Sequence, residues 1–133
     1  PNYNSVIPQS NPNQLTIDRR LLLSALRRVL PFGSKSSQLV KFKLAAGSLE
    51  LSSEDIDYAT KAHETLACDY AGQNMSIGFK GSSLTEILSN LDGDQVNIEL
   101  ADPSRAGIIV PVEQPENEDV LMLLMPMLLS DQN

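Results

Sequence analysis

The chain has 133 residues, of which 41% are hydrophobic and 20% are charged, and its formal net charge is −7. These values predict one domain with one hydrophobic core, and they argue against a largely disordered chain and against a general binder of nucleic acid. The longest apolar run has ten residues, about half of what a membrane-spanning helix needs, and no signal-peptide pattern opens the sequence.

The first fourteen residues, PNYNSVIPQSNPNQ, have the composition of a linker. They contain three prolines and four asparagines, which favour turns and irregular backbone. We expect residues 1–13 to form a linker segment that leads into a domain over residues 14–129. A loose chain terminus of the same composition is the alternative. A polar tail over residues 130–133 ends the sequence.

The segment LTIDRRLLLSALRRVLPFG predicts a short strand that enters an amphipathic helix. Asp18 is the expected N-cap, apolar residues recur at helical spacing, and Pro31 and Gly33 end the helix. The face opposite the apolar stripe is basic, and its members are Arg20, Ser24 and Arg27, with Arg28 beside them. The helix therefore presents positive charge to its surroundings.

Basic residues are concentrated in this part of the chain. Residues 1–43 contain seven Lys or Arg and one acid, whereas residues 44–133 contain three Lys or Arg and sixteen acids. One interpretation is a basic face that contacts phosphates without reading bases, because no aromatic or Asn/Gln set is positioned for base readout. The other interpretation is an exposed helix face that is simply solvated.

Four segments that follow have the alternating polarity of strands. They are QLVKFKL, LEL, YATKAHETLACDY and MSIGF, separated by the predicted turns AAGS, SSEDID and AGQN. The only histidine, His63, has no partner for a metal site or a nucleophile and is interpreted as a surface or edge residue. The only cysteine, Cys68, is expected to be a buried, inert thiol in a reducing cytoplasm.

The segment GSSLTEILSNLDG predicts a second helix, with Ser83 and Glu86 as a capping box. Its expected core face consists of Leu84, Ile87, Leu88 and Leu91. Three more predicted strands follow, QVNIEL, AGIIVPV and VLMLLMPM. The order of elements predicts an α+β fold in which antiparallel sheet supports two helices on one side.

The apolar run over residues 120–129 lies almost at the end of the chain. It carries no charge, holds three of the four methionines and contains Pro126. Since proline has no N–H for a strand ladder, the backbone is expected to lie at an edge or to leave the sheet there. Unbranched methionines repack around varied partners, so the run indicates an interface. A C-terminal strand docked on its own sheet is the alternative.

Three stretches together resemble one family: PNYNSVIP, MSIGFKGSSLTEIL and LLMPMLL. They are similar to the C-terminal third of the bacterial DNA polymerase III β subunit, the sliding clamp, and the likeness covers residues 1–129. The resemblance implies a DNA-clamp domain with two helices packed on antiparallel β-sheet. It also implies a three-domain chain that dimerises head to tail into a ring around duplex DNA, an accessory subunit with no catalysis, no cofactor and no metal.

The resemblance further implies a hydrophobic pocket that docks short motifs of the polymerase III catalytic subunit, the clamp loader and repair proteins. The matching positions are Pro1, Ser5, Val6, Lys80, Ser83, Ser104, Ala106, Leu123, Leu124, Met125, Pro126, Met127, Leu128 and Leu129. This sequence departs from the family where Leu128 replaces a frequent arginine and where Ser37 and Ser83 replace larger side chains. The pocket is therefore expected to have its own shape.

By the same resemblance, Arg20, Arg27 and Arg28 are expected to face DNA, and Pro31 and Phe32 to lie at the dimer interface. An exposed Phe32 would fit that role and a buried one would not. The chain by itself is expected to be monomeric and to bind DNA weakly at most. A standalone peptide-binding adaptor without a DNA role is the alternative function, and an enzyme would need a cleft of convergent titratable groups.

Overall fold

The computed structural model describes residues 12–112 and 121–127. Over these residues the fold is α+β, as the order of predicted elements indicated. The helical elements are α1 (Arg19–Val29), the short 3-10 turn η2 (Leu30–Phe32) and α2 (Gly81–Asn90). The strands are β1 (Asn13–Asp18), β2 (Leu39–Ala45), β3 (Ser48–Asp55), β4 (Thr60–Ala67), β5 (Asp69–Ala71), β6 (Met75–Lys80), β7 (Gln95–Leu100), β8 (Gly107–Pro111), β9 (Met122–Leu124) and β10 (Pro126–Met127).

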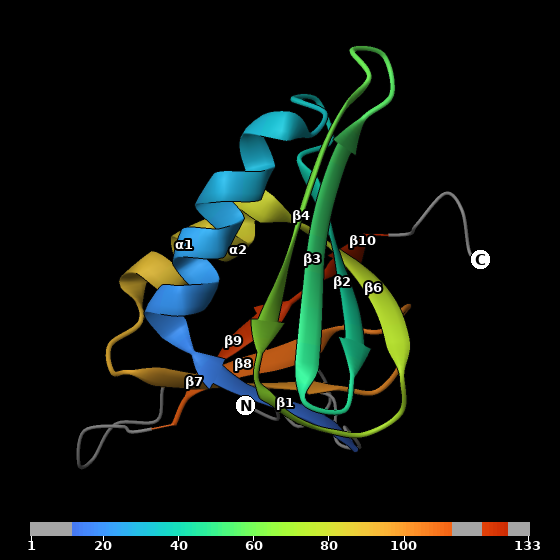
Figure 1. Ribbon diagram of the computed structural model, residues 1–133. Coiled ribbons are helices and arrows are strands. Elements are labelled where there is room, and N and C mark those ends of the chain that lie inside the picture. The colour runs from blue at the N-terminus through green and yellow to red at the C-terminus, as the bar shows by residue number, and fades with distance from the viewer. Residues whose placement is uncertain (1–11, 113–120, 128–133) are drawn as a thin grey trace.

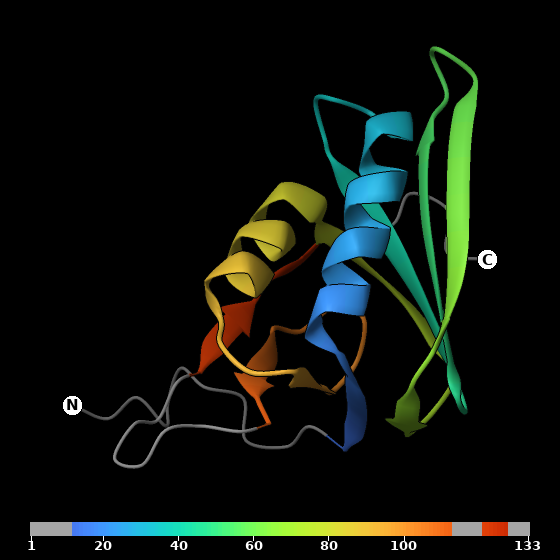
Figure 2. The ribbon, with the colours of Figure 1, turned by 60° about the vertical axis from the view of Figure 1, so that its left-hand side comes forward.

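The strands form two antiparallel five-stranded sheets rather than one. Sheet A has the order β5-β1-β7-β8-β9 and sheet B has the order β10-β6-β2-β3-β4. Figures 1 and 2 show α1 and α2 side by side, packed against the inner faces of the sheets. Two predicted strands divide between the sheets, one at Cys68 and the other at Met125. A polarity pattern does not reveal such a division, because both halves keep the same alternation.

The hydrophobic core lies between the helices and the two sheets. Phe42 of β2 and Phe79 of β6 meet edge to face, with ring centroids 5.1 Å apart. Both rings are essentially fully buried, and α1 and α2 each contribute two leucines that are at most 1% exposed. These leucines are Leu22, Leu26, Leu84 and Leu88. These four leucines have the helical spacing that the sequence predicted. Because they point into the core, the opposite faces of the two helices are exposed.

The start of α1 follows the prediction. Asp18 has extended backbone angles, and its carboxylate accepts a hydrogen bond from the Leu21 amide at 2.9 Å. The capping box predicted for α2 is wrong, because that helix begins at Gly81 and Lys80 is its N-cap, without a side-chain cap. The Gly81 amide donates to the Gln38 carbonyl at 2.7 Å, and a Cβ on Gly81 would lie 2.2 Å from Leu30 Cδ2. Tertiary packing, rather than a local cap, sets this helix start.

The turn predicted over SSEDID is partly wrong, because β3 continues through Asp55. Asp55 pairs with Thr60 at the end of the hairpin with β4. The Ser53 side chain is buried and its hydroxyl donates to the Leu39 carbonyl at 3.2 Å. This bond offsets the cost of burying a polar residue within a strand.

Arg19 ties the beginning of α1 to the end of α2. Its Nε donates to the Gly93 carbonyl and its Nη1 to the Leu88 carbonyl, both at 2.8 Å. The last carbonyls of a helix carry partial negative charge and lack partners within the helix. Arg19 satisfies one of them, that of Leu88, from another helix, so this arginine is structural although it belongs to the basic segment.

Candidate functional site

The terminal apolar segment, residues 121–127, passes from one sheet to the other. Strand β9 pairs with β8 at the edge of sheet A, and β10 pairs with β6 at the edge of sheet B (Figure 1). The break falls at Met125, directly before Pro126. The prediction that the chain leaves its sheet or reaches an edge at this proline is confirmed, because both happen there.

The two registers fix the neighbours of Met125. Leu124 lies opposite Gly107 in sheet A, and Pro126 lies opposite Phe79 in sheet B. Met125 lies between these two pairs, while Ala106 directly precedes Gly107 and Lys80 directly follows Phe79. Two strand ends far apart in the sequence, those of β6 and β8, are therefore joined by the segment around this methionine.

One buried residue interrupts an otherwise exposed or half-buried run along the terminal apolar segment. Leu124 is 3% exposed and belongs to the core, whereas Met125 is 68% exposed. Leu121, Met122 and Leu123 are also exposed, and Pro126 and Met127 are half-buried. The segment is thus anchored by one leucine while several apolar side chains face outward, which is typical of an interface.

Polar residues lie near the ends of β6 and β8, the two strands that pair with this segment. Lys80 and Ser83 are exposed at the start of α2, and half-buried Ala106 directly precedes β8. Ser104 donates its backbone amide and its hydroxyl to Asp102 Oδ1, at 2.8 and 2.7 Å. The bond from the Ser104 hydroxyl, helped by the backbone, holds the pKa of Asp102 below its usual value. These bonds stabilise the turn that precedes Ala106.

Five of the positions expected to dock peptides lie outside the described residues. They are Pro1, Ser5, Val6, Leu128 and Leu129. The described positions lie on the terminal apolar segment, at the β6–α2 junction and just before β8, and the roles of all fourteen remain predictions.

The basic face of α1 is exposed as expected, but its three arginines differ in their surroundings. Arg20 is exposed, and Arg27 donates from Nη2 to the Ser89 hydroxyl of α2 at 3.4 Å, which is a long bond. Arg28 instead forms a two-point ion pair with Glu64 of β4, with Nε–Oε2 at 2.5 Å and Nη2–Oε1 at 2.7 Å. These bonds raise the pKa of Arg28 and lower that of Glu64. Arg20 and Arg27 are therefore freer than Arg28 to contact an anion.

Pro31 and Phe32 lie on η2, at the end of α1, and both are exposed. The Phe32 side chain is 46% exposed, and its backbone carbonyl accepts a hydrogen bond from Thr60 Oγ1 at 2.8 Å. This bond fixes η2 against the beginning of β4, which is an edge strand of sheet B. The exposure of Phe32 fits an interface role, which stays a prediction.

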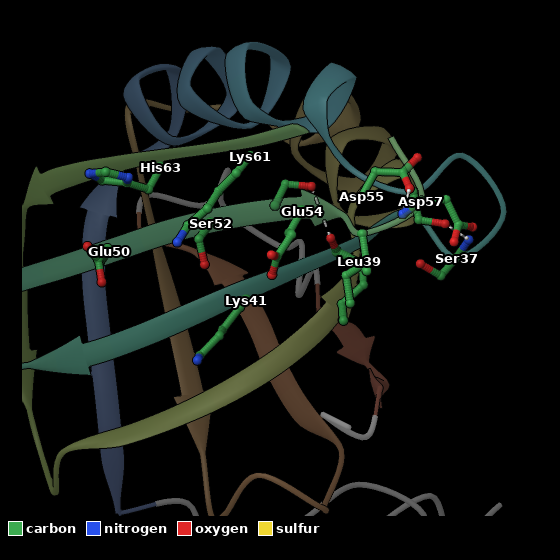
Figure 3. A pocket seen from close by; sticks show the side chains of 13 residues that line it. Ser37, Leu39, Lys41, Glu50, Ser52, Glu54, Asp55, Asp57, Lys61 and His63 are labelled. Atoms are coloured by element: carbon green, nitrogen blue, oxygen red, sulfur yellow. Dashed lines mark hydrogen bonds between the residues drawn. The ribbon is translucent and has the colours of Figure 1, made fainter. Parts of the chain in front are cut away.

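A hollow of about 770 Å³ lies on the outer face of sheet B, away from the helices (Figure 3). Exposed His63 lies in it on β4, directly opposite Ser52, so its prediction as a surface or edge residue is confirmed. Glu54 and Lys61, which also line the hollow, face each other across the same pair of strands. Opposite charges on paired strands stabilise each other, so we interpret this hollow as a solvated sheet face.

Cys68 is half-buried rather than buried, because it lies in the gap between β4 and β5. Burial, with a smaller contribution from Asp69, raises the pKa of its thiol.

Within residues 12–112 and 121–127, no group of three or more His, Cys, Asp or Glu side chains is arranged to hold a metal ion. None of the helices in those ranges is long and apolar enough to cross a membrane.

The sequence matches the family described as the DNA polymerase III beta subunit, C-terminal domain, over residues 4–128. The beta sliding clamp of Caulobacter vibrioides is 32% identical over 124 residues, which are 93% of this chain and 33% of that protein. The beta sliding clamp of Chlamydia muridarum is 30% identical over 134 residues, which cover 98% of this chain and 34% of that protein. The chain therefore spans about a third of the length of these curated relatives.

Solved structures have the same fold. The DNA polymerase III subunit beta of Pseudomonas aeruginosa, solved bound to griselimycin, matches with a TM-score of 0.88 and 26% identity over 97% of this chain and 34% of that one. The pol III beta of Caulobacter crescentus matches with a TM-score of 0.86 and 30% identity over 97% of this chain. With the family match over nearly the whole sequence, the chain belongs to the family formed by the C-terminal domains of DNA polymerase III beta subunits.

Proposed function

We propose that this chain, through residues 14–129, serves as the C-terminal domain of a sliding clamp, the factor that keeps a replicative polymerase on DNA. The observation that carries the proposal is the fit of almost the entire chain to about a third of a solved clamp, with a TM-score of 0.88. The whole protein would be a cytoplasmic homodimeric ring around duplex DNA. Its work would be to hold partners in place rather than to catalyse a reaction.

The charge distribution supports the DNA part of this proposal. The basic face of α1 carries Arg20 and Arg27, whereas residues 44–133 carry sixteen acids and three Lys or Arg. A ring that slides needs attraction to phosphates without base-specific contacts, and a basic helix face on an acidic body provides it. Binding by the isolated chain should be weak and salt-sensitive, because retention by a ring comes from closure around the DNA.

The terminal apolar segment supports the docking part. Exposed Met125, together with Lys80 and Ala106 at the adjoining ends of β6 and β8, would form one wall of a pocket for short motifs of the polymerase III catalytic subunit, the clamp loader and repair proteins. The preceding domain of the whole protein would form the other wall. Exposed Pro31 and Phe32 would pack against a second protomer, and the isolated chain would be monomeric.

Titration with griselimycin, which the Pseudomonas aeruginosa clamp binds, tests this function on the chain as it stands. Addition of griselimycin should shift the NMR signals of Leu123 and Met125. Met125→Asp should abolish these shifts and leave the fold intact, because this side chain is largely exposed. Met122→Asp, the same change at an exposed methionine outside the docking positions, is the matched control and should retain binding. Shifts confined to other parts of the domain, or equal losses in both variants, would contradict the docking proposal.

A further inference from the structure

The four methionines of the chain differ in how far solvent reaches them. Met125 is 68% exposed, whereas Met122 is 41% exposed. Met127 is half-buried on β10, and half-buried Met75 of β6 packs against the hydrophobic core. A methionine is oxidised only where the oxidant reaches its sulfur atom. The Met125 sulfur is therefore the one most open to an oxidant in solution.

Met125 takes part in neither of the two strands beside it. Strand β9 ends at Leu124, which carries the core contact of the segment, and β10 begins at Pro126. An oxygen atom added to the Met125 side chain would stay in solvent, so the fold should tolerate it. The same atom added to Met75 would lie against the core, where an unpaired polar group lowers stability.

The surface around Met125 along the chain is apolar. Leu121, Met122 and Leu123 are exposed, and Pro126 is half-buried. A thioether packs well against apolar groups of a ligand, whereas a sulfoxide is polar and carries a hydrogen-bond acceptor. Covering that acceptor with an apolar ligand costs free energy, because no hydrogen bond replaces the one to water. Oxidation of Met125 would therefore weaken docking on this surface and leave the domain folded.

We propose that Met125 is a reversible oxidation site through which peroxide weakens docking at the terminal apolar segment. The inference rests on the proposed function, because it assigns a regulation to the docking surface. In the reaction the thioether sulfur attacks one oxygen of hydrogen peroxide, an S–O bond forms and the O–O bond breaks. Sulfur loses two electrons, and the peroxide that gains them leaves one molecule of water. Methionine sulfoxide reductases reverse the step with two thiols, which become a disulfide while the oxygen leaves as water.

The order in which the methionines are oxidised is the first test. Isotope labelling of their methyl groups gives one NMR signal for each of the four methionines, which single Met→Leu variants assign. Under limiting hydrogen peroxide, Met125 should be converted to the sulfoxide first, Met122 second and Met75 last. The chain oxidised at Met125 alone should unfold at the same urea concentration as the untreated chain. Equal oxidation rates at Met75 and Met125, or early unfolding, would overturn the proposal.

The affinity for griselimycin, measured by calorimetric titration, is the second test. The quantity compared is the ratio of affinities after and before peroxide treatment of each protein, so the starting affinities of the variants do not matter. Peroxide should reduce the affinity of the parent about tenfold or more, and that of Met122→Leu by the same factor. The ratio for Met125→Leu should stay near one, because no sulfur remains at that position. Reductases for both sulfoxide epimers should restore binding by the parent.

A third readout needs no variant at Met125. Across increasing doses of peroxide, the loss of griselimycin binding by the parent should follow the oxidised fraction of Met125 measured by NMR. A loss that follows Met122 or Met75 instead, or an equal loss in Met125→Leu, would contradict the assignment to Met125.

Failure of this inference is distinguishable from failure of the proposed function. Full griselimycin binding by the chain oxidised at Met125 would sink the oxidation site and leave the docking proposal standing. An untreated chain that binds no griselimycin would contradict the docking proposal, and the oxidation site with it.

Discussion

Arg28 and Glu64 are joined by two hydrogen bonds, from Nε to Oε2 at 2.5 Å and from Nη2 to Oε1 at 2.7 Å. The pair connects the last turn of α1 to an edge strand of sheet B, across 36 positions of sequence. A planar guanidinium that donates two hydrogen bonds to one carboxylate is held in a fixed orientation. The basic surface of α1 is thus narrower than its sequence indicates.

The contribution of this pair to stability should depend on pH. The pKa of Glu64 is lowered from its ordinary 4.5, chiefly by the hydrogen bond from Arg28. A lowered folded-state pKa gives stability that is present above the unfolded pKa and is lost as pH falls through the folded one. Urea midpoints of the parent and Glu64→Gln should differ slightly near pH 7 and coincide near about pH 2. A difference that persists in acid would show that the glutamate acts through packing.

Arg19 and Arg20 are adjacent arginines with different expected roles. Arg19→Ala removes two hydrogen bonds to the carbonyls of Leu88 and Gly93, and should lower the free energy of unfolding by about 1–3 kcal/mol. Arg20→Ala removes an exposed side chain and should stay within about 0.5 kcal/mol of the parent. Urea unfolding of both variants makes the comparison, and equal losses would contradict the structural role of Arg19.

Leu123 and Leu124 are neighbours on β9 with opposite burial. Leu124→Ala should lower the free energy of unfolding by about 2–4 kcal/mol, because this leucine is 3% exposed in the core. Leu123→Ala should cost less than about 1 kcal/mol and instead weaken griselimycin binding. Thermal unfolding and calorimetric titration measure the two effects. Loss of binding in the Leu124 variant alone, at temperatures where it remains folded, would move the docking surface elsewhere.

Gly107 begins β8 where backbone and side chain approach closely. A Cβ at this position would lie 2.9 Å from the Glu99 carbonyl oxygen and 2.6 Å from Leu100 Cδ2. Gly107→Ala should therefore lower stability by about 1–3 kcal/mol, since the strand must shift. Because Gly107 lies opposite Leu124, the shift should also weaken griselimycin binding. An unchanged free energy of unfolding in Gly107→Ala would contradict this prediction, because it would mean that the strand shifts without loss of stability.

The parts of the fold that sequence reasoning predicted are those that local rules determine. The N-cap Asp18, the basic face of α1 and the break at Pro126 each follow from residues within one helical turn or one strand. The start of α2 did not follow, because Gly81 is held by Gln38 and Leu30 from another part of the chain. Capping rules do not include such contacts.

In the candidate sites, too, sequence reasoning predicted local features and missed contacts between distant residues. The terminal apolar segment could be recognised from composition, whereas the pairing of Arg28 with Glu64 joins residues with no sequence signal between them. Arg19 carried one usable signal, since a cation at the first position of a helix is unfavourable for the helix dipole. Such a residue is expected to have a partner elsewhere, and here it caps α2.

The most direct test of the central proposal is the retention of the intact protein that contains this chain, once a clamp loader has placed it on circular duplex DNA. A closed ring should remain on circular DNA through a wash at about 150 mM salt, because retention by closure does not depend on phosphate affinity. Cutting the circle once should release it. Equal loss from circular and cut DNA would contradict the assignment of this chain to a sliding clamp.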